Sequence, residues 1–119
     1  PAGLVEQGEA MNDAAVREFH EETGLHLKVI PADDMYTKPR FTTVGMTDEA
    51  CGMVYGYASG VPDNRFEENS EDIQVVLADK KEVRRILKEE NVAMMCAYML
   101  LHFLKSEGDP LGFIEMQEK

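Results

Sequence analysis

The first helical pattern of hydrophobic residues lies close to the start of the chain. Val16, Phe19 and Thr23 recur at a spacing that places them on one side of a helix. This side is expected to pack on the core. Asn12 is a suitable N-cap, because its side chain can accept a hydrogen bond from a first-turn N–H group. Gly24 is a suitable end of the helix, because glycine tolerates the left-handed conformation.

Two further helices are predicted in the C-terminal third. Residues 79–90 carry a narrow apolar stripe, with Asp79 as the expected N-cap. Residues 92–105 are apolar almost throughout, which predicts a buried or interface helix that begins after Asn91. The short apolar patch at residues 111–114 is expected to dock on a partner subunit.

Between these helices the pattern changes to alternation, which predicts strands. Residues 25–30 alternate and end at a proline, and residues 51–59 are rich in valine, tyrosine and small residues. Residues 71–76 are expected to enter a further strand. Residues 35–43 are predicted to be extended, after a turn at residues 31–34.

A different side of the first helix carries candidate metal ligands. Glu18, Glu21 and Glu22 fall together at spacings of three and four residues. Three carboxylates this close repel one another unless a cation neutralises them, and hard divalent cations such as Mg²⁺ prefer oxygen ligands. Arg17 can pair with Glu21, four residues later. A solvated acidic helix face is the alternative interpretation of the glutamates alone.

The residues around these glutamates complete a known pattern. Gly3, then Glu9, then the run from Arg17 to Leu25 fill every fixed position of a 23-residue motif that is similar to the Nudix box. The resemblance implies an α/β fold, the Nudix α/β/α sandwich with a mixed β-sheet. Nudix folds place strands before the box, so residues 1–119 are expected to be one Nudix domain that begins at its box, the C-terminal portion of a longer protein.

The resemblance also implies roles for individual residues. Glu18 and Glu22 are the expected ligands of Mg²⁺ or Mn²⁺, with Glu21 as a flexible third ligand. In similar enzymes the backbone carbonyl at the Ala2 position joins them. Arg17 orients the glutamates. Two further residues are expected at the site. Glu9 is expected to brace the loop, and Gly3 is expected to lie beside the substrate.

Short matches outside the box point to one subfamily, the ADP-ribose and ADP-sugar pyrophosphatases. Residues 44–49 resemble a segment near the pocket of those enzymes, so Gly45 and Met46 are expected to help shape a substrate pocket. A plain hairpin turn is an equally good interpretation. The acidic loop that contains Glu68 and Glu71 resembles the loop that supplies a general base. Glu71 is the preferred candidate, and a solvated loop is the alternative.

This subfamily implies Mg²⁺-dependent hydrolysis of ADP-ribose or an ADP-sugar to AMP and a sugar phosphate. Two alternatives stay open: a Nudix hydrolase of nucleoside triphosphates or dinucleotides, and a non-catalytic domain that binds a nucleotide-sugar as a regulatory ligand. Similar enzymes form dimers with shared sites, so a homodimer is expected.

Composition limits the partners. The chain of 119 residues has a formal net charge of −11, which argues against nucleic acids and anionic membranes as partners. The two cysteines, Cys51 and Cys96, lack metal-ligand spacing and lie in apolar stretches. They are expected to be buried free thiols of a cytoplasmic protein.

Overall fold

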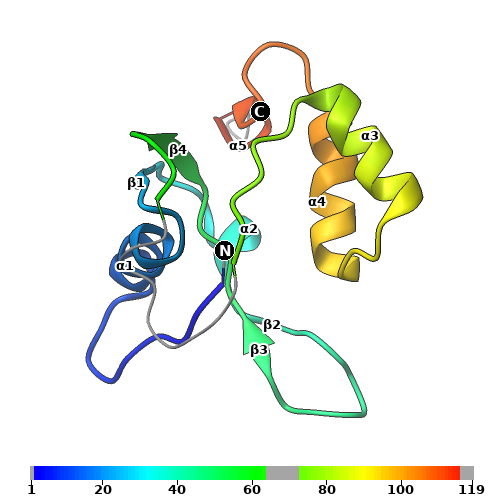
Figure 1. The fold of residues 1–119 in the computed structure, drawn as a ribbon. Coiled ribbons are helices and arrows are strands. Elements are labelled where there is room, and N and C mark those ends of the chain that lie inside the picture. Colours follow the sequence, from blue (N-terminus) through cyan, green and yellow to red (C-terminus); the bar gives the residue numbers. More distant parts are fainter. Residues whose placement is uncertain (1, 64–72, 116–119) are drawn as a thin grey trace.

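The structure is a computed structural model, and it describes residues 2–63 and 73–115 (Figure 1). Within these ranges the first half of the chain contains helices and short strands, and the second half contains helices. The elements in chain order are α1 (Met11–Thr23), β1 (His26–Val29), α2 (Asp34–Thr37), β2 (Arg40–Phe41), β3 (Ala50–Cys51), β4 (Gly56–Ser59), α3 (Lys80–Glu89), α4 (Met94–Lys105) and α5 (Gly112–Glu115).

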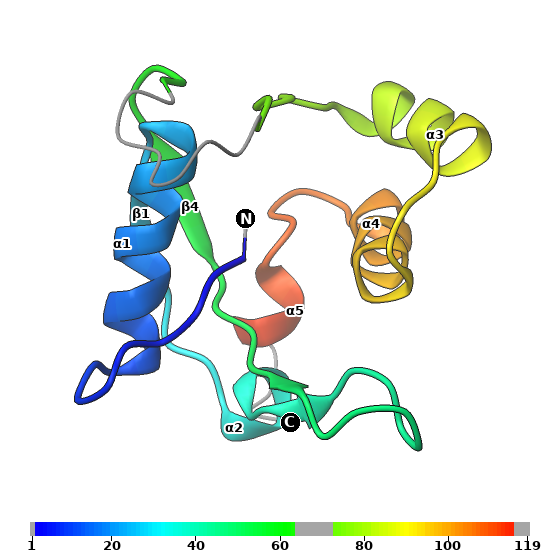
Figure 2. The same ribbon diagram turned by 60° about the horizontal axis from the view of Figure 1, so that its bottom comes forward.

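The strands form two antiparallel pairs. β1 pairs with β4, with His26 opposite Ser59, and β2 pairs with β3. α1 packs on β1, so that helix and strand lie side by side in Figures 1 and 2. Helices with small antiparallel sheets are consistent with the predicted α/β class. The predicted mixed sheet is not seen in the described ranges, where both strand pairs are antiparallel.

The prediction of a strand at residues 25–30 is confirmed by β1. The predicted strand at residues 51–59 is wrong in its middle, because β3 ends at Cys51 and β4 begins only at Gly56. Between them the backbone bonds to other segments instead: the Met53 N–H group donates to the carbonyl of Thr37 (3.0 Å), and the Tyr55 carbonyl accepts from Ile30 (2.9 Å).

The segment before β2 also differs from its prediction. Residues 35–37 are helical, because the Asp33 side chain accepts a hydrogen bond from the Met35 N–H group (2.9 Å) and caps α2. The turn residue Asp33 therefore has a capping role. Further along, residues 73–76 form no strand, although their sequence predicts one.

α3 begins as predicted: the Asp79 side chain accepts a hydrogen bond from the Glu82 N–H group (2.8 Å). α4 begins later than predicted, with Ala93 as its N-cap in place of Asn91 and with no side-chain cap. The two helices pack on each other, and the Lys80 ammonium group donates to the Ser106 carbonyl beyond the end of α4.

α4 is less buried than predicted, since none of its side chains is buried. Met94 is 76% exposed and Tyr98 is 68% exposed. Cys96 on the same helix is exposed, so the prediction of a buried thiol is wrong there, and Cys51 is half-buried. No helix within residues 2–63 and 73–115 is both long enough and apolar enough to cross a membrane.

The few buried residues are spread along the chain, on α1, just before β1, on α3 and on α5. The buried apolar side chains of the described ranges are Ala14, Leu25, Val83 and Ile114. Thr23 is buried as predicted, but Val16 is 39% exposed, so its predicted place in the core is wrong.

The C-terminal apolar patch packs within its own chain. Ile114 is fully buried, and the Phe113 ring meets the rings of Tyr36, Tyr55 and His102 edge-on at centroid distances of 5.6, 5.9 and 4.2 Å. Ile114 is therefore not available to a partner subunit, and the expected docking of this patch stays a prediction.

Candidate active site

The site is built on α1 and on the loop that leads into it. The helix begins at Met11 with Ala10 as N-cap and no side-chain cap, so Asn12 lies inside the helix and the predicted cap is wrong. The end is as predicted. Gly24 adopts a left-handed conformation (φ 74°) and donates its N–H group to the His20 carbonyl (2.8 Å).

Arg17 is the centre of the site. Its Nε and Nη2 atoms bind the two carboxylate oxygens of Glu9 at 2.9 and 3.0 Å. Nη1 donates to Glu18 at 2.9 Å and to Glu21 at 3.3 Å, and Nη2 donates to the Leu4 carbonyl at 3.1 Å. One planar guanidinium group therefore fixes three carboxylates and the lead-in loop.

Glu9 closes that loop. Its Oε1 atom accepts from the Glu6 N–H group at 3.0 Å, and its own N–H group donates to the Glu6 carbonyl at 3.0 Å. Gly8 supplies the positive φ (81°) that the turn requires. The hydrogen bonds from Arg17, and then the one from Glu6, lower the pKa of the Glu9 carboxyl group. Glu9 thus braces the loop, as predicted.

Gly3 lies directly against Glu18. A Cβ atom at position 3 would lie 2.5 Å from both Cγ and Oε2 of Glu18, which is closer than real Cβ contacts. The absence of a side chain at Gly3 therefore lets the lead-in backbone lie close against Glu18, the glutamate that Arg17 also binds. Gly3 is thereby placed at the glutamates, and its expected contact with substrate stays a prediction.

The other predicted residues are placed as follows. Glu22 lies half-buried on the last turn of α1, and Ala2 lies in the exposed lead-in. Gly45 (φ 86°) and Met46 (81% exposed) lie in the loop between β2 and β3, drawn away from α1 in Figure 1. The Met46 and Thr47 N–H groups both donate to the Thr43 carbonyl, which makes this loop a hairpin turn.

The two candidate bases, Glu68 and Glu71, lie outside the described residues. Their predicted role therefore stays a prediction.

The residues suit a hard divalent cation in chemistry, since all the side-chain donors are carboxylates. In residues 2–63 and 73–115 no three acidic, histidine or cysteine side chains converge in an arrangement that could hold a metal ion. Glu18 and Glu21 instead turn one oxygen each toward Arg17, which supplies their neutralising charge. The second oxygens of Glu18 and Glu21, together with Glu22, are the donors that could hold a cation.

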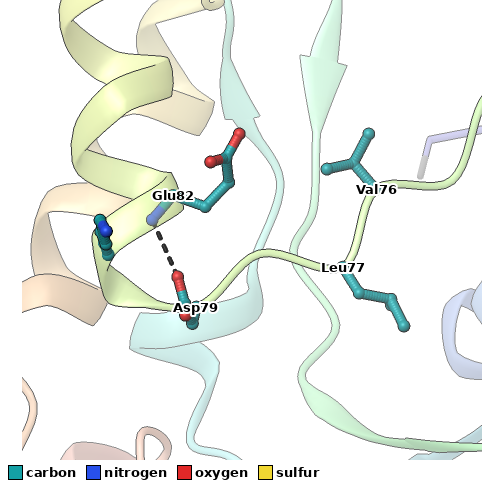
Figure 3. A pocket seen from close by; sticks show the side chains of 5 residues that line it. Val76, Leu77, Asp79 and Glu82 are labelled. Atoms are coloured by element: carbon teal, nitrogen blue, oxygen red, sulfur yellow. Dashed lines mark hydrogen bonds between the residues drawn. The ribbon is translucent and has the colours of Figure 1, made fainter.

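Sequence reasoning missed two backbone contributions, the Leu4 carbonyl and the Glu6 N–H group. Neither has a signal in residue type, because every residue carries a backbone carbonyl and every residue except proline carries a backbone N–H group. Elsewhere, an open hollow between the chain before α3 and its first turn is lined by residues none of which was predicted as a site residue (Figure 3). They are Val76, Leu77, Asp79, Lys81 and Glu82. Asp79 is engaged there as the α3 cap.

Comparison with known proteins agrees with the motif. The model of the NUDIX domain matches residues 1–102. The protein named "Putative nudix hydrolase 2" of Caenorhabditis elegans is 35% identical over 86 residues, which cover 67% of this chain. The matched region spans only 37% of that relative's length. No solved structure matches the chain.

Proposed function

Because the chain belongs to the Nudix family, we propose that the intact protein hydrolyses a nucleoside diphosphate linked to another moiety. The observation that carries this proposal is the cluster in which Arg17 holds Glu9, Glu18 and Glu21 within 3.3 Å of its guanidinium nitrogens. Without the hydrogen bonds from Arg17, three glutamates on one helix would form an ordinary solvated acidic face.

The proposed substrate is ADP-ribose or an ADP-sugar, with AMP and a sugar phosphate as products. Support comes from the sequence resemblance at the lead-in, at residues 44–49 and in the acidic loop. In the proposed reaction a water oxygen attacks one phosphorus, the bridging phosphorus–oxygen bond breaks, and the water proton passes to a glutamate. Glu71 is the first candidate for that base, and Glu68 and Glu21 are the others.

Glu18, Glu21 and Glu22, with the Ala2 carbonyl, would hold Mg²⁺ or Mn²⁺. A bound divalent ion would neutralise the diphosphate and lower the pKa of a water ligand. Arg17 fixes the side chains of Glu18 and Glu21 so that they need not be ordered at the moment of binding. Glu9 and Gly3 keep the lead-in loop against them.

A homodimer and a cytoplasmic location complete the proposal. The dimer rests on family resemblance alone. The location rests on the two free cysteines.

The test is turnover of ADP-ribose by the intact protein, with and without Mg²⁺, measured as AMP formed. Glu18→Gln and Glu22→Gln should each lower kcat by about 10- to 100-fold or more, because each removes a charged ligand. Asp13→Asn is the matched control: it removes an exposed carboxylate from the same helix, outside the cluster, and should leave kcat unchanged. Full Mg²⁺-dependent activity in both glutamine variants would refute the proposal.

The same assay separates the two alternatives. Binding of ADP-ribose without turnover would favour a regulatory domain. Faster turnover of a nucleoside triphosphate or a dinucleotide in a competition panel would keep the enzyme class and change the substrate.

A further inference from the structure

The C-terminal end of α1 is a meeting point of three segments. Thr23 is only 5% exposed, its hydroxyl group donates to the Phe19 carbonyl (2.6 Å), and its Oγ1 atom accepts from the Leu25 N–H group (3.0 Å). Gly24 closes the helix in the left-handed conformation. This end lies directly after Glu22, one of the proposed cation ligands.

The chain that leaves β4 returns across this helix end. β4 ends at Ser59, opposite His26, and Gly60 then turns with a φ of 107° beside Leu25. Asp63 donates its N–H group to the Thr23 carbonyl at 2.6 Å. The last carbonyls of a helix have no partner within it, so this bond satisfies a group that would otherwise depend on solvent.

Gly24 makes the approach of Asp63 possible. A Cβ atom at position 24 would lie 2.7 Å from the N and Cβ atoms of Asp63, and closer still to its carbonyl oxygen. Real Cβ atoms essentially never come within 3.0 Å of such atoms. Gly24 therefore has two separate reasons to be glycine: its positive φ, and the backbone of Asp63 lying against it.

We propose that Thr23, Gly24 and Asp63 form a fixed joint that positions the chain after β4 against the glutamate-bearing end of α1. Gly24 and Asp63 are then positioning residues, an inference that rests on the proposed function. In the sequence, four residues lie between Asp63 and Glu68, which is itself outside the described residues.

The experiment compares glycines that share the backbone conformation but differ in surroundings. Gly24→Ala introduces both the strain of a positive φ and the collision with Asp63. Gly24→Asn relieves much of the strain, because asparagine tolerates this conformation, but keeps the colliding Cβ. Gly108→Ala is the matched control, since Gly108 has a φ of 69° and no atom within 4 Å of its ideal Cβ position.

Two readouts are taken on the intact protein. With ADP-ribose and Mg²⁺, both Gly24 variants should lower kcat by about 10- to 100-fold per folded molecule, with KM within about twofold of wild type. Hydrogen exchange at the Asp63 amide should accelerate by about tenfold or more in the same variants. Gly108→Ala should change neither.

The proposal is overturned if the Gly24 variants lose no more activity per folded molecule than Gly108→Ala. It is also overturned if the Asp63 amide exchanges equally slowly in all variants, because the bond to Thr23 would then not depend on Gly24. If wild type shows no turnover, the proposed function fails on its own, and the exchange measurement still decides whether the joint exists.

Discussion

At the scale of single residues, the geometry of Arg17 predicts that lysine cannot replace it. An ammonium group is a point charge and cannot bind both oxygens of Glu9 while also holding Glu18. Arg17→Lys should lower kcat by about 10- to 100-fold, the usual cost of losing a group that orients metal ligands. Steady-state turnover of ADP-ribose by the intact protein measures this loss.

Arg85 offers the matched control. It also binds three glutamates, with nitrogen–oxygen distances of 2.6, 3.1 and 2.5 Å, but on the exposed surface of α3. Arg85→Lys should leave kcat unchanged. Equal losses in the two lysine variants would mean that Arg17 acts only through general stability.

The lowered pKa of Glu9 predicts a pH dependence of stability. Since the folded pKa lies below the unfolded value, the stabilising contribution is complete above the unfolded value. It is lost as the pH falls through the folded pKa, because the unfolded chain takes up its proton first. The difference in unfolding free energy between wild type and Glu9→Gln should therefore be constant near pH 7 and shrink below about pH 4.5.

Urea unfolding at a series of pH values measures this difference. Glu107→Gln, a change at an exposed position outside the site, supplies the comparison. A difference that grows on acidification would contradict the assigned role of Glu9.

Residue-level prediction succeeded where one helix carries both partners. The pairing of Arg17 with Glu21 follows from their four-residue spacing, and the structure confirms it at 3.3 Å. The bidentate bond from Arg17 to Glu9 could not be derived from spacing. Seven residues lie between the two, and the position of Glu9 depends on the tight turn that precedes it and on the Glu6 backbone.

At the scale of elements, the N-terminus of α4 lacks a side-chain cap, so a substitution there should stabilise the protein. Ala93 is the N-cap and offers no side-chain acceptor, whereas Asp79 caps α3. Ala93→Asp should raise the free energy of unfolding by about 1 kcal/mol, because it would satisfy a first-turn N–H group and complement the helix dipole. Asp79→Ala should lower it by a similar amount. Urea unfolding tests both, and no gain from Ala93→Asp would contradict the assigned cap.

The burial of Ile114 in α5 predicts a larger change in the free energy of unfolding. Ile114 is fully buried, so Ile114→Ala should lower the free energy of unfolding by about 2–5 kcal/mol, while Ile114→Val should cost only about 0.5–1.5 kcal/mol. Urea unfolding of the two variants gives both values. Equal and negligible losses would contradict the assigned place of Ile114 in the core of its own chain.

Helix prediction was better than strand prediction for a physical reason. α1 and α3 have local signals, since their apolar stripes and the caps Gly24 and Asp79 lie within the segments themselves. β2 and β3 contain two residues each, and they form only because Arg40 and Cys51 meet across a hairpin. The packing of Phe113 depends on partners as distant in sequence as Tyr36, which no local pattern shows.

At the scale of the whole molecule, the excess of acidic residues decides how cations should act. With 23 acidic and 12 basic side chains, the net charge of −11 opposes compaction. Any added salt would screen this repulsion. A specific site predicts more: Mg²⁺ should stabilise the intact protein beyond NaCl at the same ionic strength. At ten times its Kd the added free energy of unfolding is about 1.4 kcal/mol.

Thermal and urea unfolding in matched MgCl₂ and NaCl solutions, followed by removal of the metal with a chelator, measure this excess. Glu22→Gln should abolish it, because it removes a proposed ligand, and Asp13→Asn should preserve it while changing the net charge by the same amount. If MgCl₂ and NaCl stabilise wild type equally, the glutamates of α1 hold no specific cation. The overall charge alone would then account for the response, and Arg17 would suffice to neutralise Glu18 and Glu21.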